Sequence, residues 1–208
     1  MFRSVFEGLN KMAHNGRVVI GLGGNIGAGK TTAAKIFEEL GAHYISADEI
    51  GWQVLAEIKE SLCKKFGEQI VKGKEIDKER LRDIVFRNPE NLDYLNRLSH
   101  PLLISKIKKK LNSIKEGVVV LDAALLFDWP EVLKEIDYPI LITANKGIKE
   151  ERAGRKGISK DVFNRILSLQ NDERAMSSQA KFIIENNGTL TELKKECQEI
   201  YEEIRDDC

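Results

Sequence analysis

The residues best suited to chemistry form a glycine-rich segment near the start of the sequence. Residues 24–31 read GNIGAGKT and fit the pattern G-x-x-x-x-G-K-[S/T]. Glycines at this spacing let the backbone wrap around phosphate groups with its amides pointing inward. We expect Lys30 to reach the β- and γ-phosphates of a nucleoside triphosphate and the Thr31 hydroxyl to hold Mg²⁺. The predicted nucleotide contacts are Asn25, Ile26, Gly27, Ala28, Gly29, Lys30, Thr31 and Thr32.

The segments around this loop alternate between strand and helix patterns. A β-branched apolar stretch at residues 17–22 precedes the glycines, and a helix is expected at 31–40, ended by Gly41. Further strands are expected at residues 43–46, 118–122, 138–143 and 181–185. Nearly continuous apolar runs fit strands covered on both faces, and the alternation with helices fits right-handed crossovers. The sequence therefore predicts an α/β fold with a three-layer, parallel, five-stranded sheet.

Two helical regions stand outside this simple alternation. Residues 49–116 read almost wholly as helix and are too long for a plain crossover, so an inserted helical subdomain is expected at 51–116. Within it we expect a turn or short hairpin at 71–74 and a new helix beginning at Asn88 and Pro89. The last helix begins at a capping box formed by Thr189 and Glu192. Its apolar stripe predicts docking on the sheet and comprises Leu190, Leu193, Cys197, Ile200, Tyr201 and Ile204.

Composition limits the class of protein and its partners. The 208 residues fit one domain with an insertion, and 33 Lys+Arg balance 33 Asp+Glu, so no overall field favours nucleic acid or an anionic membrane. No apolar run approaches the ~20 residues of a membrane span. Cys63, Cys197 and Cys208 lack metal or redox spacing, so reduced thiols are expected. We expect a soluble cytoplasmic monomer or small homo-oligomer, with residues 1–16 as a non-targeting N-terminal extension before a domain at 17–208.

Two alternative classes of nucleotide-binding protein can be tested at single positions. Residues 145–148 begin like the guanine-specific N/T-K-x-D loop but carry Ile148 where the aspartate is needed. The strand expected at 118–122 ends in Asp122 followed by Ala123, without the glutamate that would activate water in a mechanical ATPase. These departures favour a small-molecule kinase, which holds an acceptor hydroxyl in line with the γ-phosphate. A non-catalytic nucleotide switch stays open.

A kinase also needs a base and mobile cations, and two further segments offer them. Asp48 follows the second expected strand, where α/β sheets present ligand-binding residues. It is our candidate base and a candidate magnesium ligand, and the competing role is a helix N-cap. Arg152 and Arg155 follow the fourth strand at i, i+3 spacing and could form an arginine lid at residues 147–160. The competing interpretation is a solvated charged helix.

With these residues in place, the sequence from residue 18 to about 204 resembles the dephospho-coenzyme A kinase family. Besides the loop, the resemblance rests on AD at 47–48, QV at 53–54, FRNP at 86–89, LSHPL at 98–102, DAALLFD at 122–128, Arg152, Arg155, Gln170, and IENNG at 184–188. The loop is generic to many nucleotide-binding proteins. The other segments, at these separations, distinguish this family from other nucleotide kinases.

The resemblance implies a fold of the P-loop kinase type and an activity. The activity is ATP-dependent phosphorylation of the ribose 3′-hydroxyl of dephospho-coenzyme A, the last step of coenzyme A synthesis, with magnesium. It further implies that the insertion at 51–116 binds the acceptor and that Asp48 is the base. By the same resemblance, Lys30 and Arg155 stabilise phosphate charge, and Asn186 and Asn187 lie near the adenine of ATP. The implied acceptor-side residues are His100, Leu125, Leu126 and Phe127.

Four positions depart from the family pattern. Ser46 stands where the family has aspartate, Asn25 replaces a glycine, Ala124 replaces a proline and Asp128 replaces a glutamate. None of these changes removes the loop lysine, the candidate base or the lid arginines. A nucleoside or nucleoside-monophosphate kinase of the same fold is the alternative activity.

Overall fold

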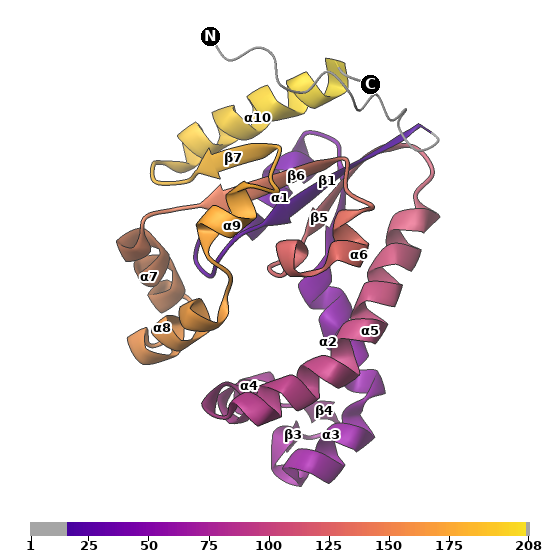
Figure 1. Ribbon diagram of the computed structural model, residues 1–208, viewed down its shortest axis with the longest axis vertical. Coiled ribbons are helices and arrows are strands. Elements are labelled where there is room, and N and C mark those ends of the chain that lie inside the picture. The colour runs from indigo at the N-terminus through magenta and orange to yellow at the C-terminus, as the bar shows by residue number, and fades with distance from the viewer. Residues whose placement is uncertain (1–15, 207–208) are drawn as a thin grey trace.

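The computed structural model describes residues 16–206 and contains a five-stranded, fully parallel sheet with helices on both faces (Figure 1). In spatial order the strands are β2 (His43–Ser46), β5 (Gly117–Asp122), β1 (Arg17–Gly23), β6 (Tyr138–Thr143) and β7 (Phe182–Glu185). Each expected strand is present, with bounds that differ from the prediction by no more than one residue. The predicted α/β sheet is thereby confirmed.

Alternating side chains of β1 show how the two faces are filled. Ile20 and Leu22 pack in the core formed with α1 (Lys30–Glu39) and α10 (Leu190–Asp206). Val19 points to the opposite core, which receives side chains from α2 (Ala47–Glu57), α5 (Pro89–Ser113) and α6 (Pro130–Leu133). Because successive strand residues face opposite sides, one short strand contributes side chains to both cores. The sheet therefore forms the middle of three layers.

Helix α10 begins at the expected capping box. Thr189 donates to Glu192 through its backbone amide and its hydroxyl, and Glu192 N–H donates back to the Thr189 hydroxyl oxygen at 3.3 Å. The apolar stripe packs as predicted except at Leu190, which is 55% exposed. Leu190 is the first residue of the helix and lies beyond the stretch covered by the core, so its placement on the buried stripe was wrong.

The inserted region between β2 and β5 has its own small core. It contains α3 (Lys59–Phe66), the short η1 (Glu68–Ile70), the hairpin strands β3 (Val71–Lys72) and β4 (Glu75–Ile76), and α4 (Lys78–Arg87). The hairpin and the α5 start are as expected, with the Asn88 side chain accepting from Glu90 N–H. The buried residues of this core are Leu62, Phe66, Ile70, Leu81 and Val85. Figure 1 shows α2 and α5 leading from the sheet to this region.

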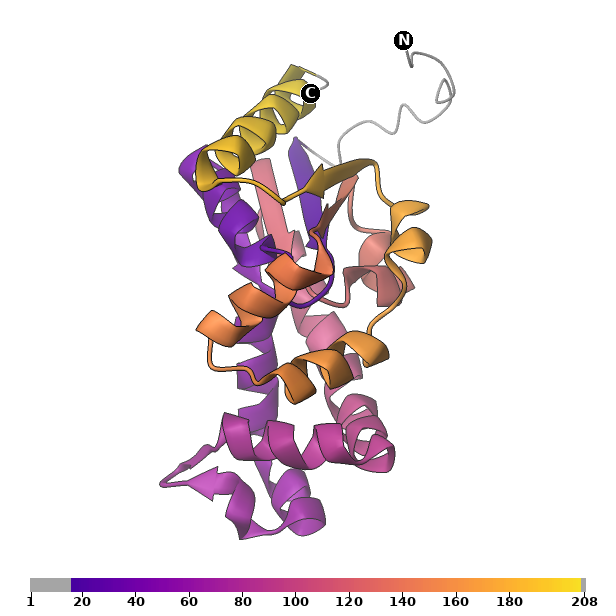
Figure 2. The ribbon, with the colours of Figure 1, turned by 90° about the vertical axis from the view of Figure 1, so that its left-hand side faces the viewer.

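A second projection leaves the sheet between β6 and β7. It consists of α7 (Lys146–Arg155), α8 (Lys160–Leu169) and α9 (Glu173–Ser177). Figure 2 shows α7 and α8 between the sheet and the inserted region.

The short turn η2 (Leu126–Asp128) follows β5 and completes the elements of the described chain. No helix within residues 16–206 combines the length and apolar character that a membrane crossing requires. The extension expected at residues 1–16 lies, apart from Gly16, outside the described residues, as does Cys208.

Candidate active site

The glycine-rich loop lies at the carboxyl end of β1 and leads into α1, which begins at Lys30. Gly27 and Gly29 have positive φ angles of 77° and 105°. A Cβ atom at Gly27 would lie 2.3 Å from the carbonyl oxygen of Lys149, and one at Gly29 would lie 2.2 Å from Asn186 Nδ2. Both positions therefore require glycine for conformation and for space. The close approach also shows that α7 and the segment after β7 support the loop.

Lys30 folds back over this loop. Its ammonium group donates to the carbonyl oxygens of Gly24 at 2.8 Å and Asn25 at 3.2 Å. Burial lowers the pKa of Lys30, while the carboxylates of Asp122 and Asp48 act in the opposite direction. A triphosphate would add further negative charge next to this half-buried ammonium group.

Asp122, the last residue of β5, lies beside Thr31 in the first turn of α1. The Thr31 hydroxyl donates to Asp122 Oδ2 at 2.7 Å. Burial raises the pKa of the Asp122 carboxyl, and the hydrogen bond from Thr31 and the charge of Lys30 counteract this rise. Asp122 was not among the predicted site residues, although a carboxylate that ends a buried strand beside a phosphate loop is a signal for such a role.

Asp48 lies in the first turn of α2, exposed to solvent. The cap of this helix is Ser46, whose hydroxyl oxygen accepts from Glu49 N–H at 3.2 Å. The competing N-cap role considered for Asp48 is therefore performed by another residue. The charge of Asp48 acts on the pKa of both Lys30 and Asp122. Ser46, two residues before Asp48, pairs with Asp122 across β2 and β5, so the candidate base lies at the start of α2 near the end of β5.

The donor set beside the loop fits magnesium. Thr31, Asp122 and Asp48 offer a hydroxyl and two carboxylates, and Mg²⁺ favours such oxygen ligands. Among residues 16–206, no group of three or more His, Cys, Asp and Glu side chains could hold a metal by itself. Magnesium at nucleotide sites takes one or two carboxylates together with phosphate oxygens and water.

The predicted nucleotide residues Arg152 and Asn186 are brought together against the loop. Arg152 Nη1 donates to the Asn186 carbonyl oxygen at 3.0 Å, and Nη2 donates to Asn186 Oδ1 at 3.2 Å. Asn186 Nδ2 in turn donates to the carbonyl oxygen of Ala28 at 2.8 Å. Asn187 Oδ1 accepts from Asn145 N–H at 2.7 Å, at the start of α7. These residues connect the loop, the α7 helix and the end of β7.

Arg155 takes a different direction from Arg152. Its side chain is 74% exposed and pairs with Glu151 of the same helix at 2.5 Å. The structure thus does not bring Arg155 to the phosphate loop. Residues at i, i+3 lie about 60° apart on the same side of a helix, but Arg155 is the last residue of α7 and lies almost one turn beyond Arg152.

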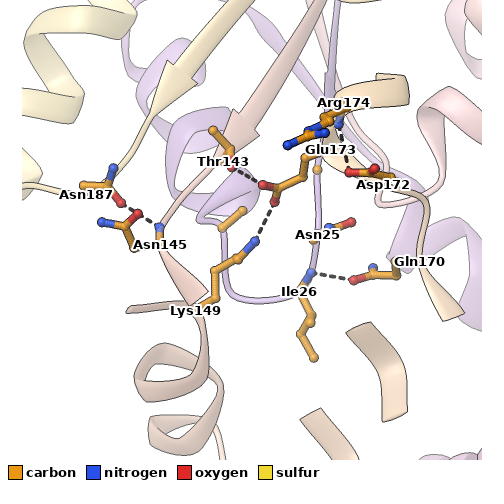
Figure 3. A network of polar contacts seen from close by, with 12 residues as sticks. Asn25, Ile26, Thr143, Asn145, Lys149, Gln170, Asp172, Glu173, Arg174 and Asn187 are labelled. Carbon is orange, nitrogen blue, oxygen red and sulfur yellow. Dashed lines mark hydrogen bonds and ion pairs between the residues drawn. The ribbon is translucent and has the colours of Figure 1, made fainter. Parts of the chain in front are cut away.

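A buried polar network, missed by the sequence analysis, fastens α7 beside the loop (Figure 3). Lys149, only 5% exposed, pairs with Glu173 Oε1 at 2.6 Å, and the Thr143 hydroxyl donates to Glu173 Oε2 at 2.7 Å. Gln170 Oε1 accepts from the amide of Ile26 at 2.9 Å. The network joins the end of β6, α7, α9 and the phosphate loop. Because Gly27 lies against the Lys149 backbone, it also fixes the position of the loop.

The residues expected on the acceptor side occupy different environments. His100 packs edge-on against Trp129 with ring centroids 5.5 Å apart. Burial lowers the pKa of His100, and the charge of Asp128 opposes this change. Leu126 and Phe127 are buried core residues lying under Gly21 and Gly23, so they offer almost no exposed surface to an acceptor. Leu125 is half-buried and stays a candidate contact.

These features together define a class of enzyme. A glycine-rich loop between β1 and α1, a lysine and a hydroxyl at the helix start, and two carboxylates lie at the carboxyl edge of a parallel sheet. A second helical arm contacts the loop. The class is that of the P-loop kinases, which transfer a phosphoryl group from a nucleoside triphosphate.

Comparisons with known proteins narrow this class. The family model for dephospho-CoA kinase matches residues 18–192. A dephospho-CoA kinase from Aquifex aeolicus (strain VF5) is 33% identical over 193 residues, covering 90% of this chain and 98% of that protein. The crystal structure of TT1252 from Thermus thermophilus has a TM-score of 0.74 at 26% identity, covering 90% of this chain and 98% of that one. Dephospho-CoA kinase from Campylobacter jejuni has a TM-score of 0.62 at 26% identity, covering 90% and 97%. The chain belongs to the dephospho-CoA kinase family.

Proposed function

We propose that this protein transfers the γ-phosphoryl group of ATP to the ribose 3′-hydroxyl of dephospho-CoA and so forms coenzyme A. The observation that carries the proposal is the arrangement of Lys30, Thr31, Asp122 and Asp48 beside a glycine loop of the right conformation. Membership of the dephospho-CoA kinase family supports the choice of acceptor.

In the proposed reaction the chain positions two substrates and balances charge. Asp48 orients the acceptor hydroxyl and takes its proton as the oxygen bonds to phosphorus and the bond to ADP breaks. Lys30 and the loop amides stabilise the charge on the phosphoryl oxygens. Thr31 and Asp122, with Asp48 nearby, would hold magnesium, which when bound neutralises part of the triphosphate charge.

We propose that Arg155 joins the phosphates only when the lid at residues 147–160 closes. In the structure it forms an exposed i, i+4 pair with Glu151. Exposed pairs of this kind contribute roughly 0.3–0.5 kcal/mol, so a triphosphate can compete for the guanidinium at little cost. Arg152 already contacts the loop and would hold α7 in place during this step.

Mass spectrometry of the product tests the proposed function. The protein is incubated with ATP, magnesium and dephospho-CoA, and we expect one added phosphate, which fragmentation places on the ribose 3′-oxygen. Parallel reactions use adenosine and AMP as acceptors. Transfer to AMP without transfer to dephospho-CoA would support the nucleoside-monophosphate kinase alternative. Rapid ATP hydrolysis without any acceptor would instead favour an ATPase.

We also propose that the protein works in the cytoplasm as a monomer or small homo-oligomer that does not need nucleic acid. The free thiols Cys63 and Cys197 support the location, since reduced cysteines are typical of that compartment. The equal numbers of acidic and basic residues support the absence of a nucleic-acid partner. Light scattering during gel filtration would give the oligomeric state.

A further inference from the structure

A cleft of about 430 Å³ opens between α4 of the inserted region and α8. Its volume is in the range of small-molecule sites. Arg82 and Arg87 line it from α4, and Arg165 lines it from α8. Figure 2 shows these two helices facing each other below the sheet. A molecule bound here would contact both projections of the chain at once.

The side chain of Arg82 is the most enclosed of the three cleft arginines. The Nε atom of Arg82 is buried and has no hydrogen-bond partner. None of the three cleft arginines takes part in an ion pair among residues 16–206. On α5, by contrast, Arg97 pairs with Asp93 at 3.0 Å. A buried donor without a partner points to a missing acceptor, because such donors are rare in folded proteins.

Acidic residues in the same cleft do not neutralise it. Asp83 and Asp161 also line the cleft, yet neither forms an ion pair in the described part of the chain. Both are exposed to solvent, as are Arg87 and Arg165, whereas Arg82 is half-buried. The three guanidinium groups exceed the two carboxylates, which leaves the cleft net positive. This charge favours an anionic ligand.

We infer that the cleft holds the diphosphate group of the acceptor, mainly on Arg82 and Arg165. The inference rests on the proposed function, because dephospho-CoA carries a diphosphate between its adenosine and its pantetheine arm. Planar guanidinium groups bind phosphate oxygens through paired hydrogen bonds. Phe86 lines the same cleft and offers an apolar surface for the pantetheine arm. Occupation by the diphosphate would draw α8 and the inserted region together around the acceptor.

Two acceptors that share the ribose 3′-hydroxyl test this inference. Dephospho-CoA contains the diphosphate, whereas adenosine lacks it. In Arg82→Gln and Arg165→Gln we expect kcat/KM for dephospho-CoA to fall by about 10- to 100-fold, mostly through KM, because each change removes charge-assisted hydrogen bonds. With adenosine both variants should match the unmodified protein. Arg82→Lys should restore part of the loss, since it keeps the charge but not the fork.

A control and a binding measurement complete the design. Arg97→Gln removes a paired arginine from α5 and should leave both acceptors unaffected. If adenosine turns over too slowly, calorimetry measures dephospho-CoA binding to the ADP-loaded protein. Its Kd should then rise about tenfold in Arg82→Gln and Arg165→Gln but not in Arg97→Gln. Circular dichroism and thermal melting verify that each variant folds.

The possible failures are distinguishable. If the unmodified protein neither phosphorylates nor binds dephospho-CoA, the proposed function is wrong, and this inference falls with it. If the unmodified protein is active and the folded Arg82→Gln and Arg165→Gln variants keep normal kcat/KM and Kd for dephospho-CoA, the diphosphate lies elsewhere. An equal loss with adenosine and dephospho-CoA would also overturn the inference, because it would indicate a general effect on the active site.

Discussion

Around the phosphate loop, burial and charge act against each other on individual side chains. Burial lowers the pKa of Lys30 and raises that of Asp122, so it disfavours the charged form of both residues. Their opposite charges partly compensate for this, and Thr31 adds a hydrogen bond to Asp122. Such residues cost stability in the free protein and become favourable once a triphosphate and magnesium complete the site.

The first prediction concerns Asp48. Because the cap of α2 is Ser46, Asp48→Asn should leave the helix intact, yet it removes the carboxylate that we propose takes the acceptor proton. We expect kcat to fall by about 10²–10⁴-fold while ATP binding persists. Steady-state kinetics with dephospho-CoA and calorimetry with ATP measure the two effects. Glu49→Gln, one position further along the same turn, is the matched control. Near-normal turnover of Asp48→Asn would show that another group is the base.

The second prediction links Asp122 to pH. Its carboxyl pKa is raised in the folded protein, so the fold favours the protonated form and loses stability as pH rises from the ordinary aspartate pKa through the raised one. Once the pH is above this range, the carboxylate is charged and costs stability. Asp122→Asn should therefore melt at the same or a higher temperature than the unmodified ligand-free protein at pH 7, and this gain should vanish at acidic pH.

Activity should respond to this substitution in the opposite way. Asp122→Asn removes a charge from the proposed magnesium site, so kcat and the thermal stabilisation by magnesium and ATP should both decrease. Melting curves at pH 4 and pH 7, with and without magnesium and ATP, test both parts. The quantity to compare is the melting temperature of the ligand-free variant minus that of the ligand-free unmodified protein. If this difference were lower at pH 7 than at pH 4, the expected effect of pH would be contradicted.

At the scale of elements, the phosphate loop depends on α7. The network around Lys149 and Glu173 holds α7 against the end of β6, and Gln170 accepts from the amide of Ile26 (Figure 3). The shape of the loop is thus set by its glycines and by a helix distant in sequence. Movement of α7 on nucleotide binding would reach the loop directly through the contact at Gly27.

A substitution in the loop tests this dependence. In Gly27→Ala the new methyl group would lie 2.3 Å from the Lys149 carbonyl oxygen at a φ of +77°, so either the loop or α7 must move. We expect ATP affinity to fall at least about tenfold, because the strain of a left-handed alanine, roughly 1–2 kcal/mol, is combined with a backbone clash. Calorimetry with ATP is the measurement.

The hairpin of the inserted region supplies a control for this substitution. Gly73 has a φ of +65° with open space around it. Gly73→Ala therefore carries the conformational strain without the clash and should leave ATP affinity unchanged. If both variants bound ATP normally, the contact between the loop and α7 would have no part in nucleotide binding.

At the scale of the whole molecule, two helical projections extend from one sheet and face each other, and different kinds of contact stabilise them. The inserted region has a separate core around Leu62 and Phe66, whereas α7 is fastened to the sheet by polar contacts that run through Glu173 to Thr143. The nucleotide loop belongs to the sheet, and the basic cleft lies between the projections. This arrangement separates the nucleotide site from the region proposed to bind the acceptor.

That separation predicts a selective effect for a mutation in the insertion core. Leu62 is fully buried, so Leu62→Ala should destabilise this region by about 2–5 kcal/mol. KM for dephospho-CoA should rise while the Kd for ATP stays unchanged. Hydrogen exchange should accelerate in α3 and α4 but not in β1 or β5. Uniform acceleration across the sheet would show that the two cores unfold together.

Much of this architecture could be predicted from local patterns. The strands and the phosphate loop depend on the order of apolar residues and glycines within a few positions, so their bounds were predicted closely. The capping box of Thr189 and Glu192 and the helix start at Asn88 are equally local. Backbone conformation and helix ends follow mainly from near neighbours in the chain, and these features need no tertiary information.

The composition of the site was decided by contacts between distant segments. The structure directs Arg152 to the loop and Arg155 to solvent, buries Leu126 and Phe127, and pairs Thr31 with Asp122. Gln170 reaches Ile26 across 144 positions of sequence. Which face of a helix is covered, and which carboxylate meets which hydroxyl, depends on how the layers pack. Periodicity within one segment carries no information about that packing.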